Sequence, residues 1–288
     1  MANQTLAANI AELIPEITLE AQYIYQNLAL GRSLVHVEDI DGRIGNTVEF
    51  PAFTEVTASA SPAEGAAPTY HTMDLTMPTA TVAKRAVGVQ LSGLALRGAG
   101  SQITSQIGRA MALAKVKQDD TQIFNILTAT TEFATSAGQT NGALTITNAL
   151  AGLLLIQQNE VMERINCVTD ANGYNGIRTA LTPVANDDTV AGALSDQVQA
   201  EALASRAFGM DWYVTERISA GTVTATAGVT NSLIFVRSGI GYAHAWSPAN
   251  SGVELDRIAG TDTWDLLLNY YDSAIVANTK GIVKLYHI

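Results

Sequence analysis

The sequence TVEFPAF at residues 47–53 is followed by a small-residue tip, ASASPAEGAAP, at residues 58–68, and by further strand-like sequence at 69–92. A proline-free run, SQITSQIGRAMALAKVKQDDTQIFNIL, then occupies residues 101–127. A two-stranded ribbon on its own buries too little surface to be stable in water. The hairpin therefore needs a surface to lie on, and we expect that surface to belong to a neighbouring copy of the chain. This pattern favours an assembling structural protein over a free enzyme.

Alternating apolar and polar residues predict strands on both limbs of the hairpin. On the first limb Val48, Phe50 and Ala52 share one face, while Pro51 lacks an amide donor and favours a strand edge or end. On the return limb the alternating apolar residues are Met73, Leu75, Met77, Val87, Val89 and Leu91. Pro78 breaks that run.

Helical spacing of apolar residues marks the long run that follows. These residues are Ile103, Ile107, Ala110, Ala114, Phe124 and Leu127. Gly98 and Gly100 punctuate the chain just before it, and Ser101 is a plausible N-cap. We therefore predict a helix from Ser101 to Leu127, roughly 40 Å long at about 1.5 Å per residue.

The remaining sequence predicts the α+β class, because helices and strands interleave without a regular βαβ repeat. Residues 1–40 are expected to form a partly extended arm with a short helix that packs on another element or another chain. Further helices are expected at 147–164, around 176–181 and within 184–206. Further strands are expected at 165–169, 211–215, 233–236, 242–246, 253–257, 265–274 and 282–286.

The amino-acid composition and net charge favour some classes of protein over others. Hydrophobic residues make up 47% of the 288 residues and charged residues 15%, against a usual value of about 25% charged. This balance favours a surface partly covered by subunit contacts, although a compact monomer with a polar, uncharged surface has the same composition. The net charge of −11 argues against a protein that grips nucleic acid by neutralising phosphates.

No known catalytic, cofactor-binding or metal-binding motif stands out, so we expect no enzyme, no cofactor and no metal. The four histidines are far apart, and the single cysteine, Cys167, excludes an intrachain disulfide and is expected to be a small buried residue. Residues 170–173 begin like a calcium loop but lose the ligand spacing, which leaves a turn. Asp119 and Asp120 are expected on a solvated or ion-paired helix face. No secretory signal or membrane span is apparent.

The order of these elements resembles the major capsid protein of tailed bacteriophages, the HK97-type fold. The first half of the likeness rests on Gly45–Pro51 and Val87–Ser92 as the limbs of an extended loop, Ala63–Gly65 as its tip and Ala110–Asp120 as part of a spine helix. The stretches in the second half are 209–215, 242–246, 253–257 and 270–285.

The resemblance implies an HK97-like capsid fold with four regions. These are an N-terminal arm at 1–40, an extended β-hairpin loop at 41–95, a peripheral domain with the spine helix at 96–140 and 264–288, and a mixed α/β axial domain at 141–263. The residues expected to contact a neighbouring subunit are Phe50, Phe53, Glu64, Tyr70, Met73, Leu75 and Met77. The tip contains no lysine, so we predict no lysine–asparagine crosslink through it.

The implied function is that of a subunit that self-assembles into an icosahedral head around double-stranded DNA. The implied partners are copies of the chain in pentamers and hexamers, a separate scaffolding protein or prior processing, a portal and a possible decoration protein. DNA would be enclosed without sequence-specific binding, no membrane would be involved, and a virion capsid would be assembled in the host cytoplasm. Two alternatives are an encapsulin-like compartment shell, and an intracellular α+β hydrolase or binding protein.

Overall fold

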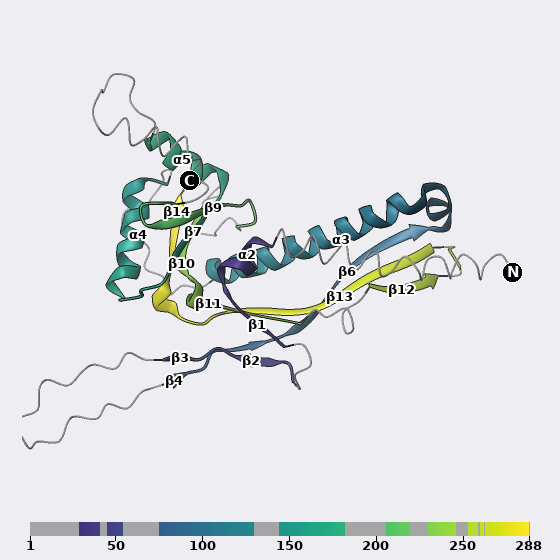
Figure 1. Cartoon of the computed structure of the whole chain (residues 1–288), viewed down its shortest axis with the longest axis horizontal. Coiled ribbons are helices and arrows are strands. Elements are labelled where there is room, and N and C mark those ends of the chain that lie inside the picture. Colours follow the sequence, from purple (N-terminus) through teal and green to yellow (C-terminus); the bar gives the residue numbers. More distant parts are fainter. Residues whose placement is uncertain are drawn as a thin grey trace, which may run out of the picture.

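The computed structural model describes residues 29–40, 45–53, 75–129, 144–181, 206–218, 230–245, 253–258, 260–261 and 263–287. These residues form two five-stranded sheets, a long helix and a small ribbon (Figure 1). The mixed composition of helices and antiparallel and parallel strands confirms the α+β class.

The first sheet is organised around one long strand, β13, Thr263–Val276. Its other strands are β1 (His36–Asp39), β6 (Ala83–Ser92), β11 (Ile240–Ala245) and β12 (Val253–Ile258). Strands β6, β11 and β12 all pair antiparallel with β13, and β1 adds to β11 in parallel. The first sheet is thus a scaffold along which a long helix can lie.

That helix, α3, runs from Gly93 to Ala129 along the face of β6 and β13 (Figure 1). Ile107 and Met111 are buried against Leu266 and Leu268 of β13, with the predicted alternating residues of β6 packed beside them. The expected start at Ser101 is wrong, because the helix continues directly from the last residue of β6. Each glycine in a helix costs only about 1 kcal/mol, and tertiary context routinely overrides such a propensity.

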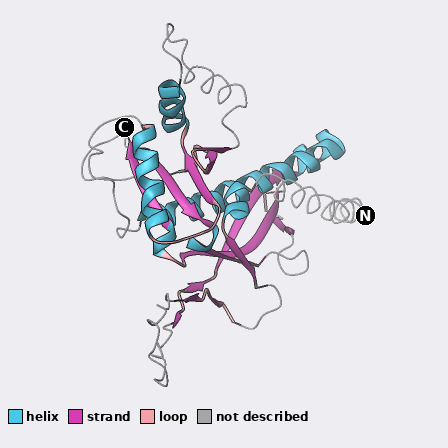
Figure 2. Cartoon of the chain, turned by 60° about the vertical axis from the view of Figure 1, so that its left-hand side comes forward, coloured by secondary structure: helices cyan, strands magenta, loops and turns pink. Residues whose placement is uncertain are grey.

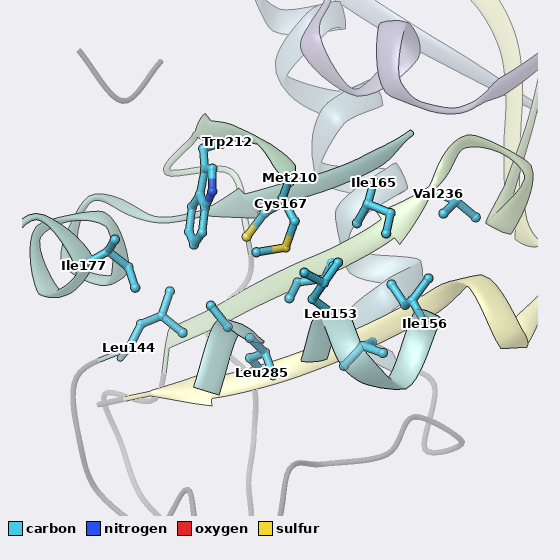
Figure 3. Close-up of a cluster of buried hydrophobic side chains, with 13 residues drawn as sticks. Leu144, Leu153, Ile156, Ile165, Cys167, Ile177, Met210, Trp212, Val236 and Leu285 are labelled. Carbon is cyan, nitrogen blue, oxygen red and sulfur yellow. The ribbon is translucent and has the colours of Figure 1, made fainter. Parts of the chain in front are cut away.

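The second sheet has the order β14, β10, β7, β9, β8. The bounds are Ile282–His287, Thr230–Val236, Ile165–Thr169, Met210–Val214 and Arg206–Ala207, respectively. Helix α4, Ile146–Gln158, covers one face with an apolar core that includes Trp212 and Leu285 (Figure 3). Gly152 permits this close approach, because an added Cβ would lie 2.8 Å from the Ile234 Cδ1 atom.

Two local predictions for this half need correction. The expected turn at residues 170–173 is the start of helix α5, Ala171–Leu181, and the Asp170 carboxylate caps it by accepting from the Gly173 amide at 2.8 Å. The expected helix at 147–164 ends at Gln158, and Glu160 then adopts a left-handed φ of 56°. Most of the helix expected within 184–206 lies outside the described residues.

The end of the predicted arm is part of the folded body. Leu34 of helix α2 (Leu30–Leu34) and Val35, which connects α2 to strand β1, belong to a core cluster that joins both sheets. Strand β1 pairs with β11 from His36 to Asp39. Residues 1–28 lie outside the described residues, so an arm in that part of the chain stays a prediction.

The hairpin leaves the body as a narrow ribbon, which stands apart from the two sheets in Figure 2. Strand β2 (Thr47–Glu49) pairs with β5 (Thr79–Thr81), and β3 (Ala52–Phe53) pairs with β4 (Leu75–Thr76). The base of the ribbon packs through Val48, Phe50 and Ala80 on the face of the first sheet that includes Ala243. The tip at 58–68 lies outside the described residues.

Gly241 lies directly beneath the Phe50 ring, and this contact predicts the effect of a single methyl group. An added Cβ at Gly241 would lie 2.6 Å from the ring carbons. Overpacking of this kind costs about 1–3 kcal/mol, so Gly241→Ala is expected to lower the free energy of unfolding by that amount in urea titrations. Gly260→Ala is the control, because nothing lies within 4 Å of its added Cβ. Equal stability of the two variants would contradict this packing.

Candidate functional site: a buried charge network and an emerging ribbon

The structure describes only some of the seven residues predicted to contact a neighbour. Met77 is 47% exposed at the ribbon surface. Phe53 and Leu75 face each other in the β3–β4 register, and their side chains lie outside the described residues. Glu64, Tyr70 and Met73 also lie outside the described residues. A contact with a neighbour at these six positions stays a prediction.

Phe50 has a different role from the one predicted. It is only 2% exposed, packs edge-on to His36 with ring centroids 5.9 Å apart, and its amide donates to the Pro78 carbonyl at 2.9 Å. Phe50 therefore anchors the ribbon to the body of its own chain and has little surface left for a neighbour. The sequence placed it correctly on an apolar strand face, but periodicity does not say which sheet covers that face.

A buried charge network lies where α3 crosses the first sheet. Lys115, Asp119 and Asp120 of α3 are each at most 1% exposed. The Lys115 Nζ atom donates to Asp119 Oδ2 at 2.7 Å, and it lies 4.4 Å from the centre of the Tyr270 ring. The acidic pair is thus ion-paired, as one of the two sequence interpretations held, and the solvated alternative is wrong.

Asp120 joins the helix to two other parts of the fold. Its Oδ1 atom accepts from the Gly31 amide of α2 at 2.7 Å, and its Oδ2 atom accepts from the Arg217 guanidinium beyond β9. Position 31 has no room for a side chain, because an added Cβ would lie 2.9 Å from Asp120 Oδ1. Burial raises the pKa of Asp120, while these hydrogen bonds oppose the rise.

Asp272 of β13 extends the network into the sheet. It is 1% exposed and accepts a hydrogen bond from Arg85 of β6. Burial, followed by the negative charge of Asp119, raises the pKa of Asp272 to about 6, although the Arg85 guanidinium opposes this. Two carboxyl groups, Asp119 and Asp272, therefore lie close together beside one lysine.

Charge balance explains how so many ionisable groups can be buried together. The network holds three carboxyl groups, Asp119, Asp120 and Asp272, against the cations of Lys115, Arg85 and Arg217. Burial lowers the pKa of Lys115, and Asp119 partly offsets this effect. Taking an ion out of water costs several kcal/mol unless it is paired and hydrogen-bonded. The network therefore holds α3 against both α2 and the first sheet.

Sequence reasoning missed the burial of this network, although a partial signal was present. Lys115 and Asp119 follow Met111 at intervals of four, which places charged residues in line with an apolar face. Asp272 likewise alternates with Tyr270 and Ala274 on the buried face of β13. Arg217 lies in a turn after β9 and carries no such periodicity.

The described part of the chain offers little for catalysis. Within it, no group of three or more His, Cys, Asp or Glu side chains could hold a metal ion. Cys167 is fully buried, and burial raises the pKa of its thiol, so little reactive thiolate forms. None of the described helices is long and apolar enough to cross a membrane.

Several solved structures have a similar architecture. No protein-family model and no curated protein matches the sequence. A chain of Mycobacterium phage Che8 superposes with a TM-score of 0.64 at 14% identity, covering 89% of this chain and 90% of that one. The capsid of a native GTA particle gives a TM-score of 0.62 at 14% identity, with 90% of both chains covered.

An encapsulin has a similar fold. The SrpI encapsulin of Synechococcus elongatus superposes with a TM-score of 0.58 at 13% identity, covering 90% of this chain and 88% of that one. The fold is therefore the HK97-type capsid fold, and the fold expected from the order of sequence elements is confirmed.

The charge network predicts unequal effects for two neighbouring lysines of α3. Lys115→Met leaves Asp119 buried without its cation, and loss of one partner of a buried pair costs about 3–5 kcal/mol. Lys117→Met makes the same change at an exposed position, where the free energy of unfolding is expected to change by at most about 0.5 kcal/mol. Urea unfolding of the two free subunits measures both. Similar losses for the two variants would contradict a buried network.

Asp272 predicts a pH dependence of stability. Because its pKa rises from the usual 3.8 to about 6 in the folded state, its stabilisation is complete below about pH 4 and is lost as the pH rises through 6. The expected loss is about 2–3 kcal/mol. Unfolding of wild type and Asp272→Asn should be compared between pH 4 and pH 7. The difference between the two proteins isolates this carboxyl from His244, whose pKa burial lowers. Parallel pH profiles would exclude the assignment.

Proposed function

We propose that this chain is a shell subunit that self-assembles into an icosahedral container. The observation that carries the proposal is the HK97-type fold over about nine-tenths of the chain, with a ribbon that leaves its own body. A ribbon of two short ladders is not stable alone in water. A neighbouring copy would supply the missing surface, with apolar burial driving the association.

The finer proposal is the major capsid protein of a tailed bacteriophage, which encloses double-stranded DNA. Several similar structures are phage capsids. The net charge of −11 suits a container that does not adhere to its cargo, since strong DNA binding requires cationic groups at the phosphates. Pentamers and hexamers of the chain would form the head, with a scaffolding protein, a portal and, where the shell carries one, a decoration protein as partners.

An encapsulin-like compartment shell is the second candidate. It is favoured by the likeness to the SrpI encapsulin and to a virus-like particle from Pyrococcus furiosus, which covers 94% of this chain. An enzyme or a monomeric binding protein has less support, because the buried ionisable groups of the network are engaged in holding helix to sheet. A stable monomer of 30.4 kDa at high concentration would favour that third class.

Electron microscopy of the expressed chain, alone and with candidate scaffolding and portal proteins, tests the function. Closed shells support the subunit proposal, and monomers under all conditions contradict it. The cargo of particles isolated from the natural source then separates the two shell functions. Nuclease-protected double-stranded DNA indicates a phage head, whereas a packaged protein indicates a cellular compartment.

Deletion of residues 59–67 tests the role of the hairpin tip. We expect the variant to fold, because the ribbon base and both sheets lie outside the deletion, and to assemble poorly. Circular dichroism and sedimentation velocity measure the two properties. A glycine–serine replacement of equal length is the control that keeps the reach of the loop but removes its side chains. Unchanged assembly of both variants would mean that the tip makes no important contact between subunits.

A further inference from the structure

A pocket of about 310 Å³ with a mixed polar and apolar lining lies outside the charge network and outside the ribbon. It forms where α2, the start of β7, strand β9 and the short helix η1 (Arg237–Gly239) meet. The side chains that the argument uses are those of Glu163, Arg164, Asn166, Tyr213 and Arg237. The pocket thus lies at the junction between the two sheets, and we call it the Arg237 pocket.

Arg237 brings several hydrogen-bond donors to this pocket. Its Nε atom donates to the Val35 carbonyl at 3.1 Å. Among the described residues, no acceptor is found for its terminal guanidinium nitrogens. Asn166 is 5% exposed, and no hydrogen bond to its side-chain amide is found within the described part of the chain. Asn166 lines the pocket, so its side-chain amide can reach a ligand bound there.

The other charged groups of the pocket already have partners. The Glu163 carboxylate accepts from the Ser238 amide at 3.1 Å. Arg164 forms an ion pair with Asp211, and this hydrogen bond raises the pKa of Arg164. Neither Arg237 nor Glu163 forms an ion pair with a described residue, so the pocket presents one cationic and one anionic group that lack an ion-pair partner within the described part of the chain. A ligand with one negative charge can pair with Arg237 while repulsion from Glu163 stays small.

Charge favours a carboxylate over a phosphate. A guanidinium presents parallel N–H donors that match two oxygens of either group. Glu163 at the rim would repel a doubly charged anion more strongly than a singly charged one. An amide such as that of Asn166 can donate a further hydrogen bond.

We propose that the Arg237 pocket binds a carboxylate group, supplied in the assembled shell by an acidic side chain of a neighbouring copy. The second half of this proposal rests on the proposed function. The chain has 27 acidic residues against 16 lysines and arginines, so an arginine that lines an open pocket readily meets an acidic group on another copy. The contact would fix the junction of the two sheets when subunits assemble.

Binding of a free carboxylate tests the pocket in the unassembled full chain. Sodium acetate at 100 mM is expected to raise the melting temperature by about 2–4 °C over sodium chloride of equal ionic strength, as mass action requires of a ligand of the folded state. The rise should disappear in Arg237→Gln. It should shrink in Tyr213→Phe, because this variant loses a pocket hydroxyl that can donate to a carboxylate but keeps the ring that packs against the core. Arg109→Gln removes the same charge from an exposed position on α3 and should respond like wild type.

Each outcome of the acetate measurement either supports or overturns carboxylate binding in the Arg237 pocket. A rise in wild type and Arg109→Gln that Arg237→Gln lacks supports the pocket. Equal responses of all four proteins overturn it. Tyr213→Phe keeps the test decisive if Arg237→Gln fails to fold, because a full rise in this conservative variant would then overturn the pocket and a reduced rise would support it.

Assembly tests the source of the carboxylate. Loss of one charge-assisted hydrogen bond per subunit is expected to raise the subunit concentration needed for shell formation about tenfold in Arg237→Gln. Arg109→Gln should assemble at the wild-type concentration. Acetate binding with equal assembly of the two variants would overturn the neighbouring side chain as the source and leave a free anion as the ligand. If wild type forms no shells, the proposed function fails, while the acetate measurement still decides whether the pocket binds a carboxylate.

Discussion

The burial of Asp119 and Asp120 in the middle of α3 is the constraint on which the rest of the structure depends. A helix with two adjacent buried carboxyl groups can dock only where both meet partners, because an unpaired buried charge costs several kcal/mol. Lys115 on the same helix meets one, and the Gly31 amide with Arg217 meets the other. The network therefore fixes the rotation and position of α3 against α2 and the first sheet, which apolar packing alone would specify less sharply.

The ribbon is held by a different kind of interaction. Its base is fixed by apolar packing, with Phe50 seated on the bare backbone of Gly241. Beyond that base only the short β3–β4 ladder is described, and Met77 is exposed there. The chain thus combines a body held by buried ion pairs with an extension that, under the proposed function, would gain stability from another copy. This division suits a shell in which rigid subunits are joined by extended contacts, as we propose.

Helices and strands with regularly spaced apolar residues were predicted well. The wrong assignments concern single residues that could contact either of two parts of the structure. The alternation at 87–91 identified β6, and the long apolar spacing identified α3. Asp170 was assigned to a turn, although its carboxylate caps the first turn of α5. Phe50 was assigned to a neighbour, although its own first sheet covers it. Local sequence describes the face that a side chain presents but not what lies opposite.

By itself, the sequence determined the α+β class, the hairpin, the long helix and the order of elements that identifies the HK97-type fold. These depend on periodicity, which short stretches of chain encode. Only the tertiary structure decided that Asp119, Asp120 and Asp272 are buried together, since their partners Arg217 and Arg85 come from distant segments. It likewise assembled the Arg237 pocket from four separate elements. Interactions between segments far apart in sequence have no local period and arise only when the chain is folded.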